Sequence, residues 1–237
     1  MPRVDGRRPD ELRPISIQRG IVPSAPGSVL IKTGNTHVLC TACIDDAVPE
    51  WREESGLGWV TAEYDMLPAS TGKRRPRNRG GKIDGRVQEI QRLIGRSLRA
   101  IVDMKKLGQR TIWIDCDVMQ ADGGTRTASI TGAYVALVDG LKSLGRKLKS
   151  TPLIDSVAAV SVGLLDGKAL LDLNYVEDVK ADVDFNVVRT GRGRFIEVQG
   201  SGEEATFSRA ELDKILLLAE KGIVGLSRIQ QKALSST

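Results

Sequence analysis

The segment Gly123-Gly124-Thr125-Arg126 combines the residue types that bind an anion at the start of a helix. An apolar pattern typical of a strand precedes it and one typical of a helix follows it. The first amides of a helix have no partner within the helix, and glycines let the backbone approach a ligand. Thr125 offers a hydroxyl group and Arg126 a planar guanidinium that suits phosphate. The segment predicts a phosphate cradle, although an ordinary glycine turn beside a surface arginine would have the same sequence.

A second arginine, Arg86, falls in the first turn of another predicted helix, which begins near Asp84. Arg86 and Arg126 thus each stand at a helix start. We expect that the two side chains could converge on one oxyanion, with the alternative that each is a solvated surface arginine.

Three carboxylates form a second group: Asp178, Asp182 and Asp184. If a strand begins at Asp182, Asp182 and Asp184 point to the same face, and Asp178 lies in the loop before it. Close carboxylates repel one another unless a cation or a proton lies between them, and such oxygen ligands suit Mg²⁺. The alternative is an acidic rim of a sheet. A similar pair, Asp115 and Asp117, precedes the glycine segment and is a weaker candidate.

A basic stretch interrupts the apolar pattern between residues 67 and 82 and predicts a projecting loop. Its cations would release counterions from a nucleic-acid backbone and so bind RNA in a salt-dependent way. No aromatic residue lies in this stretch, which argues against base reading there. The predicted RNA-binding residues are Lys73, Arg74, Arg75, Arg77 and Arg79, with Lys82 nearby.

A zinc site is the alternative use of His37, Cys40, Cys43 and Cys116. The segment 37–44 reads as a strand, however, so residues three apart point to opposite faces, and no second C-x-x-C is present. Buried cysteines in a reduced protein are the favoured interpretation. Because the chain has a single histidine, a Ser–His or Cys–His nucleophile is also disfavoured.

The elements that must position these residues alternate in type along the chain. Asp166-Gly167 and Gly34-Asn35 predict hairpins, and Ser208 with Glu211 predicts a capping box. Strands are expected at 29–31, 38–40, 58–67, 111–119, 157–165, 169–176, 182–188 and 194–198. Helices are expected from 84 to 101, after Gly124 to 144, and from 208 onward. This order predicts an α+β fold with mixed sheets in a single domain, residues 1–237.

The composition fits a self-folding chain that meets a polyanion. Its 237 residues, 41% of them hydrophobic, are enough for a sizeable core. The net charge of +5 is modest, but the clustered cations between residues 73 and 86 create a local positive field. Without a signal-like apolar start or a membrane-length apolar run, we expect a cytoplasmic protein with no membrane partner.

Long motifs along nearly the whole chain resemble the bacterial ribonuclease PH family. The matching segments are 3–7, 12–14, 58–64, 66–68, 83–86, 89–96, 116–118, 120–126, 173–175 and 177–178. The resemblance implies the ribonuclease PH fold, with two βαβ-type halves of mixed sheets and packed helices, assembled as a homohexamer, a trimer of dimers.

The resemblance also implies an activity and roles for particular residues. The activity is a phosphorolytic 3′-to-5′ exoribonuclease, a reversible nucleotidyltransferase that trims tRNA 3′ ends and serves rRNA processing, with inorganic phosphate as co-substrate and Mg²⁺ as cofactor. It implies that Arg86, Gly124, Thr125 and Arg126 hold phosphate. It implies that Asp178 and Asp184 are catalytic, at the metal or as proton donors, and that the basic loop guides RNA.

Two other functions would use the same composition. A noncatalytic RNA-binding subunit of an exosome-like ring need not keep both the arginines and the aspartates, whereas this chain has all of them. A metal nuclease that uses water would need more carboxylates around a two-metal site.

Overall fold

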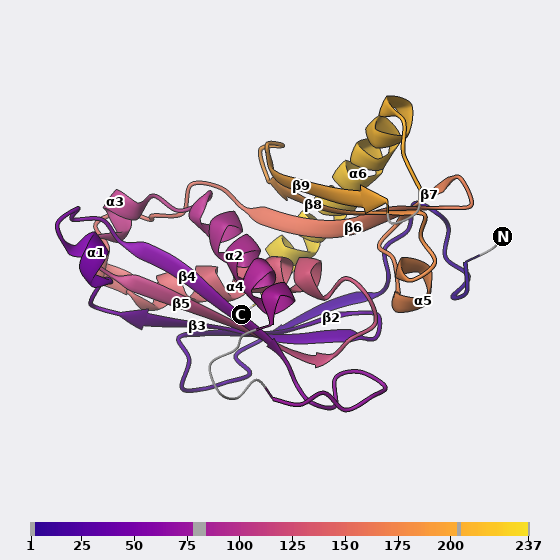
Figure 1. Cartoon of the computed structure of the whole chain (residues 1–237). Coiled ribbons are helices and arrows are strands. Elements are labelled where there is room, and N and C mark those ends of the chain that lie inside the picture. Colours follow the sequence, from indigo (N-terminus) through magenta and orange to yellow (C-terminus); the bar gives the residue numbers. More distant parts are fainter. Residues whose placement is uncertain (1–2, 78–83, 203–204, 237) are drawn as a thin grey trace.

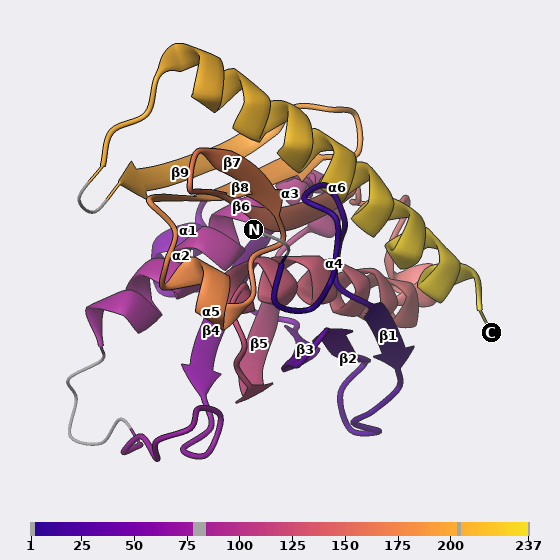
Figure 2. The same ribbon diagram turned by 90° about the vertical axis from the view of Figure 1, so that its right-hand side faces the viewer.

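The computed structural model describes residues 3–77, 84–202 and 205–236. Two sheets and their helices form successive layers, with α2 and α4 between the sheets and α6 on the far side of the second one (Figures 1 and 2). The first sheet has the order β1-β2-β3-β5-β4 and the second the order β7-β6-β8-β9. Within the described ranges, no helix has the length and apolar character that crossing a membrane requires.

The first sheet contains β1 (Ile15–Arg19), β2 (Gly27–Thr33), β3 (Thr36–Asp45), β4 (Trp59–Met66) and β5 (Thr111–Gln120). The expected hairpin joins β2 and β3 around Gly34, whose φ of 54° suits glycine. The chain crosses from β4 to β5 through α2 (Gly85–Arg99), and these two strands are parallel, so this half contains a βαβ unit. The other pairings in this sheet are antiparallel, which makes the sheet mixed.

The second sheet is antiparallel throughout its described strands, β6 (Val157–Leu165), β7 (Lys168–Leu171), β8 (Val183–Thr190) and β9 (Phe195–Gly202). The long helix α6 (Arg209–Ser235) covers one face of it. Ile215, Ala219 and Ile223 are fully or almost fully buried there. The predicted capping box is confirmed, because the Ser208 side chain accepts from the Glu211 amide and the Glu211 carboxylate accepts from the Ser208 amide.

Helix α4 (Thr125–Ser143) lies at the centre of the molecule. The helix is buried on nearly all sides because it packs on β2 and β3 from one side and on β6 from the other. Small residues make this possible. A Cβ added at Gly132 would lie 2.7 Å from Ile31 Cγ2, and one added at Gly27 would lie 2.0 Å from the Ala136 carbonyl oxygen.

Several short elements differ from the expectation. The strand predicted at 169–176 ends at Leu171, because Asp172 takes a left-handed φ of 56° and Asn174 then caps the short helix α5 (Tyr175–Asp178). Asp178 therefore ends a helical turn instead of lying in a loop. Sequence reasoning did not find β1, α1 (Glu50–Glu53), α3 (Met104–Leu107) or the 3-10 turn η1 (Gly145–Lys147). The predicted α+β class is confirmed.

Candidate functional site

A cleft of about 870 Å³ lies between the two halves of the chain. The basic loop, the start of α2, the glycine turn, the start of α4, α5, β6 and β8 all contribute to it. Its lining residues are Met66, Thr71, Gly72, Lys73, Arg75, Arg86, Ala121, Gly123, Gly124, Thr125, Arg126, Ser161, Tyr175, Asp178, Asp184 and Asn186. Residues far apart in the sequence thus line the same cleft.

The glycine turn connects β5 to α4 through two consecutive left-handed residues, Gly123 with φ 73° and Gly124 with φ 65°. A side chain at Gly123 would also lie 2.7 Å from the Leu173 carbonyl oxygen. Both positions therefore require glycine, for backbone conformation and for close approach. Gly124 caps α4 without a side-chain hydrogen bond, so the positive end of a 19-residue helix faces the cleft.

The two predicted arginines both line this cleft, which puts the starts of α2 and α4 on the same space. Asp84 caps α2 by accepting from the Arg86 amide at 3.0 Å. The Arg126 guanidinium donates to Gln199 at 2.8 Å and pairs with the Glu89 carboxylate at 3.2 Å. Arg126 is thereby oriented by two partners, one of which carries a compensating negative charge.

Thr125 shares its hydroxyl with the buried Tyr64, whose hydroxyl oxygen lies 2.9 Å away. Burial raises the pKa of Tyr64, so it keeps its proton at neutral pH. When Tyr64 donates to the Thr125 oxygen, the Thr125 proton is free to point into the cleft. The sequence did not identify this support.

Asp178 and Asp184 face the same cleft from α5 and β8. Burial raises the pKa of Asp178, and the negative charge of Asp184 adds to the rise, while Arg86, Arg126 and Arg13 oppose it. Ser201 donates a hydrogen bond to Asp184 at 3.1 Å. Asp182 is not among the lining residues, and it accepts instead from the Asp166 amide at 3.1 Å.

Two close carboxylates fit a hard cation such as Mg²⁺, which uses one or two carboxylates together with substrate phosphates. In the parts of the chain that the structure describes, His, Cys, Asp and Glu do not gather in threes as a metal cage would require. Asp178 and Asp184 are thus compatible with a cation that the substrate helps to hold.

The predicted RNA-binding residues of the basic loop differ in whether they line the cleft. Lys73 and Arg75 line the cleft, while Arg74 and Arg77 are exposed and are not among its lining residues. Burial and the charges of Asp115 and Asp65 raise the pKa of Asp117, and the Arg77 charge opposes this rise. The predicted Arg79 and its neighbour Lys82 lie outside the described residues.

The other candidate groups lie away from the cleft. Cys40 and Cys116 are buried with sulfur atoms 3.8 Å apart, while His37 and Cys43 occupy the opposite face of β3. Asp115 and Asp117 also lie on the less buried face of β5. These placements separate the ligands that a zinc site would need.

Some lining residues were missed by sequence reasoning. Asn186 stands two residues beyond Asp184 on β8, so strand alternation alone could have placed it on the same face. Tyr175 is 60% exposed and lines the cleft, although the sequence marked it only as part of a motif. Ser161 carried no signal, because it lies in an apolar strand.

Comparison with known proteins identifies the family. The profile described as 3′ exoribonuclease family, domain 1, matches residues 11–141, and that of domain 2 matches residues 155–222. A curated relative named Ribonuclease PH from Corynebacterium efficiens is 56% identical over 235 residues, covering 98% of this chain and 96% of the relative. One of the same name from Synechococcus sp. is 55% identical over 233 residues, covering 98% and 94%.

Solved structures share the fold at low sequence identity. The crystal structure of rice (Oryza sativa) Rrp46 superposes with a TM-score of 0.81 at 21% identity, covering 98% of this chain and all of the other. A chain of the Archaeoglobus fulgidus exosome with RNA bound to the active site gives a TM-score of 0.81 at 22% identity, with coverages of 95% and 91%.

The chain belongs to the 3′ exoribonuclease family. The expected ribonuclease PH fold is confirmed, and so is the expected activity, a phosphorolytic 3′-to-5′ exoribonuclease of the nucleotidyltransferase type. Phosphate is accordingly its co-substrate.

The raised pKa of Asp178 predicts a stability cost at neutral pH. A carboxyl whose folded pKa lies above its unfolded value near 3.8 destabilises the fold when ionised, and this cost disappears as the pH falls below both values. Asp178→Asn should therefore raise Tm at pH 7 in chelator-containing buffer, with a difference that narrows toward pH 4. Asp182→Asn, outside the cleft, serves as the control and should show no gain. A lower Tm for Asp178→Asn at pH 7 would contradict a raised pKa of Asp178.

Proposed function

We propose that the glycine turn holds the attacking phosphate and that Asp178 and Asp184 act on the departing RNA 3′ oxygen. The observation that carries this proposal is that one cleft contains both groups: the positive start of α4 with Arg86 and Arg126, and the two carboxylates. An anion site and an acid site within one cleft are what transfer of a nucleotide to phosphate requires.

The phosphate would be bound by charge and by backbone geometry together. The Gly124 and Thr125 region supplies helix-start amides, Thr125 a hydroxyl, and Arg86 and Arg126 charged donors. Because Arg126 is paired with Glu89 at 3.2 Å, an incoming dianion competes with a carboxylate for the same guanidinium. Phosphate binding would thus exchange an internal ion pair for one with the substrate.

The bound phosphate oxygen attacks the last phosphodiester phosphorus of the RNA, and the bond from that phosphorus to the 3′ oxygen of the preceding nucleotide breaks. The departing oxygen needs a proton, and Asp178 would supply it as a general acid, a role that the direction of its pKa shift favours. Mg²⁺ bound by Asp178 and Asp184 would instead stabilise the charge on that oxygen. Asp178 takes part in both roles.

The products would be a nucleoside diphosphate and an RNA one nucleotide shorter. A phosphodiester is exchanged for a phosphoanhydride and water takes no part, so the reaction runs in both directions. Cytoplasmic RNAs with unprocessed 3′ ends, tRNA precursors above all, fit this chemistry as substrates.

A direct test is to incubate the protein with a single-stranded RNA with and without inorganic phosphate. Phosphate-dependent release of nucleoside diphosphates is expected. Arg126→Ala and Asp184→Ala should each lower kcat/KM on the order of 10²-fold or more, because each removes charge stabilisation from the reacting groups. Both should keep the wild-type circular dichroism spectrum. Equal degradation without phosphate, or release of nucleoside monophosphates, would contradict the proposal.

The RNA end would meet Lys73, Arg75 and the exposed ring of Tyr175. Lysine and arginine track a phosphate backbone without reading sequence, and an aromatic ring can stack on any base. Arg74, Arg77 and Arg79 are proposed to guide the RNA farther from the reacting bond.

The Tyr175 contact predicts a selective loss of RNA binding. Tyr175→Ala should raise the KM for RNA roughly tenfold, since stacking contributes about 1–3 kcal/mol per base, while the KM for phosphate is unchanged. Tyr175→Phe is the matched variant and should behave like wild type. If Tyr175→Phe loses as much as Tyr175→Ala, stacking is not the contact.

A homohexamer, a trimer of dimers, is proposed for the whole chain, folded as one domain over residues 1–237. The packing of α4 on both sheets supports a single domain. An archaeal exosome core, which has this fold, supports the ring. Native mass spectrometry should find six copies of the 25.7 kDa chain, and calorimetry one cooperative transition. A monomer at micromolar concentration would overturn the assembly.

The noncatalytic alternative predicts RNA binding without turnover. This chain keeps Arg86, Arg126, Asp178 and Asp184 in one cleft, which favours the enzyme.

A further inference from the structure

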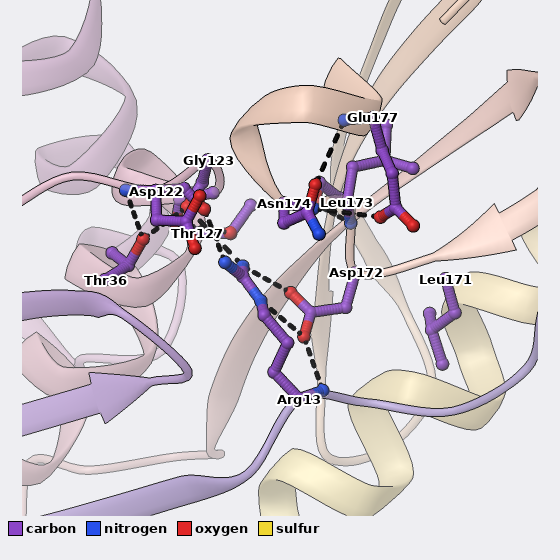
Figure 3. A network of polar contacts seen from close by, with 12 residues as sticks. Arg13, Thr36, Asp122, Gly123, Thr127, Leu171, Asp172, Leu173, Asn174 and Glu177 are labelled. Carbon is purple, nitrogen blue, oxygen red and sulfur yellow. Dashed lines mark hydrogen bonds and ion pairs between the residues drawn. The ribbon is translucent and has the colours of Figure 1, made fainter. Parts of the chain in front are cut away.

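Behind the glycine turn, the carbonyl oxygens are occupied by donors that come from outside the cleft (Figure 3). Arg13 donates to the carbonyl oxygens of Asp122 and Gly123. The Thr36 hydroxyl donates to the Gly123 oxygen at 2.7 Å and accepts from the Asp122 amide at 2.9 Å. Carbonyl oxygens repel phosphate, so holding them at the back leaves the amide side of the turn for the anion.

Arg13 is itself held rigidly by Asp172. Its guanidinium donates to the two Asp172 carboxylate oxygens at 2.7 and 3.1 Å, and its backbone amide donates to the same carboxylate at 2.8 Å. Both side chains are almost fully buried, with exposures of 3% and 4%. A buried planar guanidinium with these partners has one orientation.

The same network reaches the helix that carries Asp178. One carboxylate oxygen of Asp122 accepts from the Tyr175 amide at 3.2 Å, at the start of α5. Gly123 also lies directly against the backbone of residues 173–175. The glycine turn and α5 are therefore joined at two points, and Arg13 and Asp172 brace this junction from below (Figure 3).

We propose that Arg13 is a positioning residue that sets the distance between the phosphate cradle and Asp178. This inference rests on the proposed function, because it assigns no new reaction to the cleft. Arg13 is paired with the Asp172 carboxylate and donates to the carbonyl oxygens of Asp122 and Gly123, so it acts through the geometry of the turn and not as a phosphate ligand. Its effect on turnover should be large, because reacting groups misplaced by about 1 Å lose on the order of 10²-fold in rate.

Arg13→Lys tests this, since lysine keeps the charge toward Asp172 but cannot span both carbonyl oxygens. We expect kcat to fall on the order of 10²-fold and the KM for phosphate to rise, with the KM for RNA nearly unchanged. The matched control is Arg3→Lys. Arg3 is equally buried and pairs with Glu177 on α5 at 2.6 Å, yet its hydrogen bonds go to other carbonyl groups than those of the glycine turn.

A structural effect alone would lower Tm in both variants and change the kinetics of both alike. That result would overturn the positioning role. Thr36→Val provides a second variant if Arg13→Lys does not fold, because it removes the donor to Gly123 from the opposite side. It should raise the KM for phosphate in the same way, and an unchanged KM for phosphate in Thr36→Val would also count against the proposal.

If the wild-type protein degrades RNA equally well without phosphate, the proposed function fails. If wild type depends on phosphate and Arg13→Lys matches Arg3→Lys in kcat and in the KM for phosphate, only the positioning role fails.

Discussion

Helix α4 packs against a sheet on each side, and much of the architecture depends on this packing. A helix buried on nearly all sides has little room for charged residues, and α4 accordingly consists mostly of small and apolar residues, with its charged side chains, Arg126, Asp139 and Lys142, toward its two ends. Gly27 and Gly132 let the neighbouring backbone and side chains come close. Because the helix is fixed in the interior, its first turn can emerge at only one place. That place is the junction of the two halves, where the cleft lies.

The cleft balances charge within a small space. Arg86 and Arg126 face Asp178 and Asp184, and Glu89 compensates Arg126. Burial raises the pKa of Asp178 even though three arginines oppose the rise. This balance suits the anionic substrate that we propose, because the incoming charge would compete with Glu89 for Arg126. Tyr64 contacts Thr125, and Thr36, Arg13 and Asp172 form the hydrogen-bond network at the glycine turn, to which we assign a positioning role.

The same fold serves chains of quite different sequence. Structures at 21% and 22% identity superpose on this one with a TM-score of 0.81, which shows a common fold and leaves chemistry to the residues in the cleft. Family membership rests on the two domain profiles and on relatives near 55% identity, and the activity class follows from it. The particular roles of Arg126 or Asp178 depend on geometry that can be tested residue by residue.

The sequence by itself determined the α+β class, the main helices and strands, the glycine turn and the list of charged candidates, because these follow from periodicity, capping and local backbone preference. It predicted the capping box at Ser208 and the hairpin at Gly34 correctly for the same reason. It could not determine which carboxylates line the same cleft. Asp182 leaves the cleft, and Asp178 enters it only because Asp172 turns the chain into α5. The sequence also could not predict the contacts of Arg13 with Asp122 and Asp172. These residues follow Arg13 by 109 and 159 positions in the chain, and they meet it only through tertiary packing.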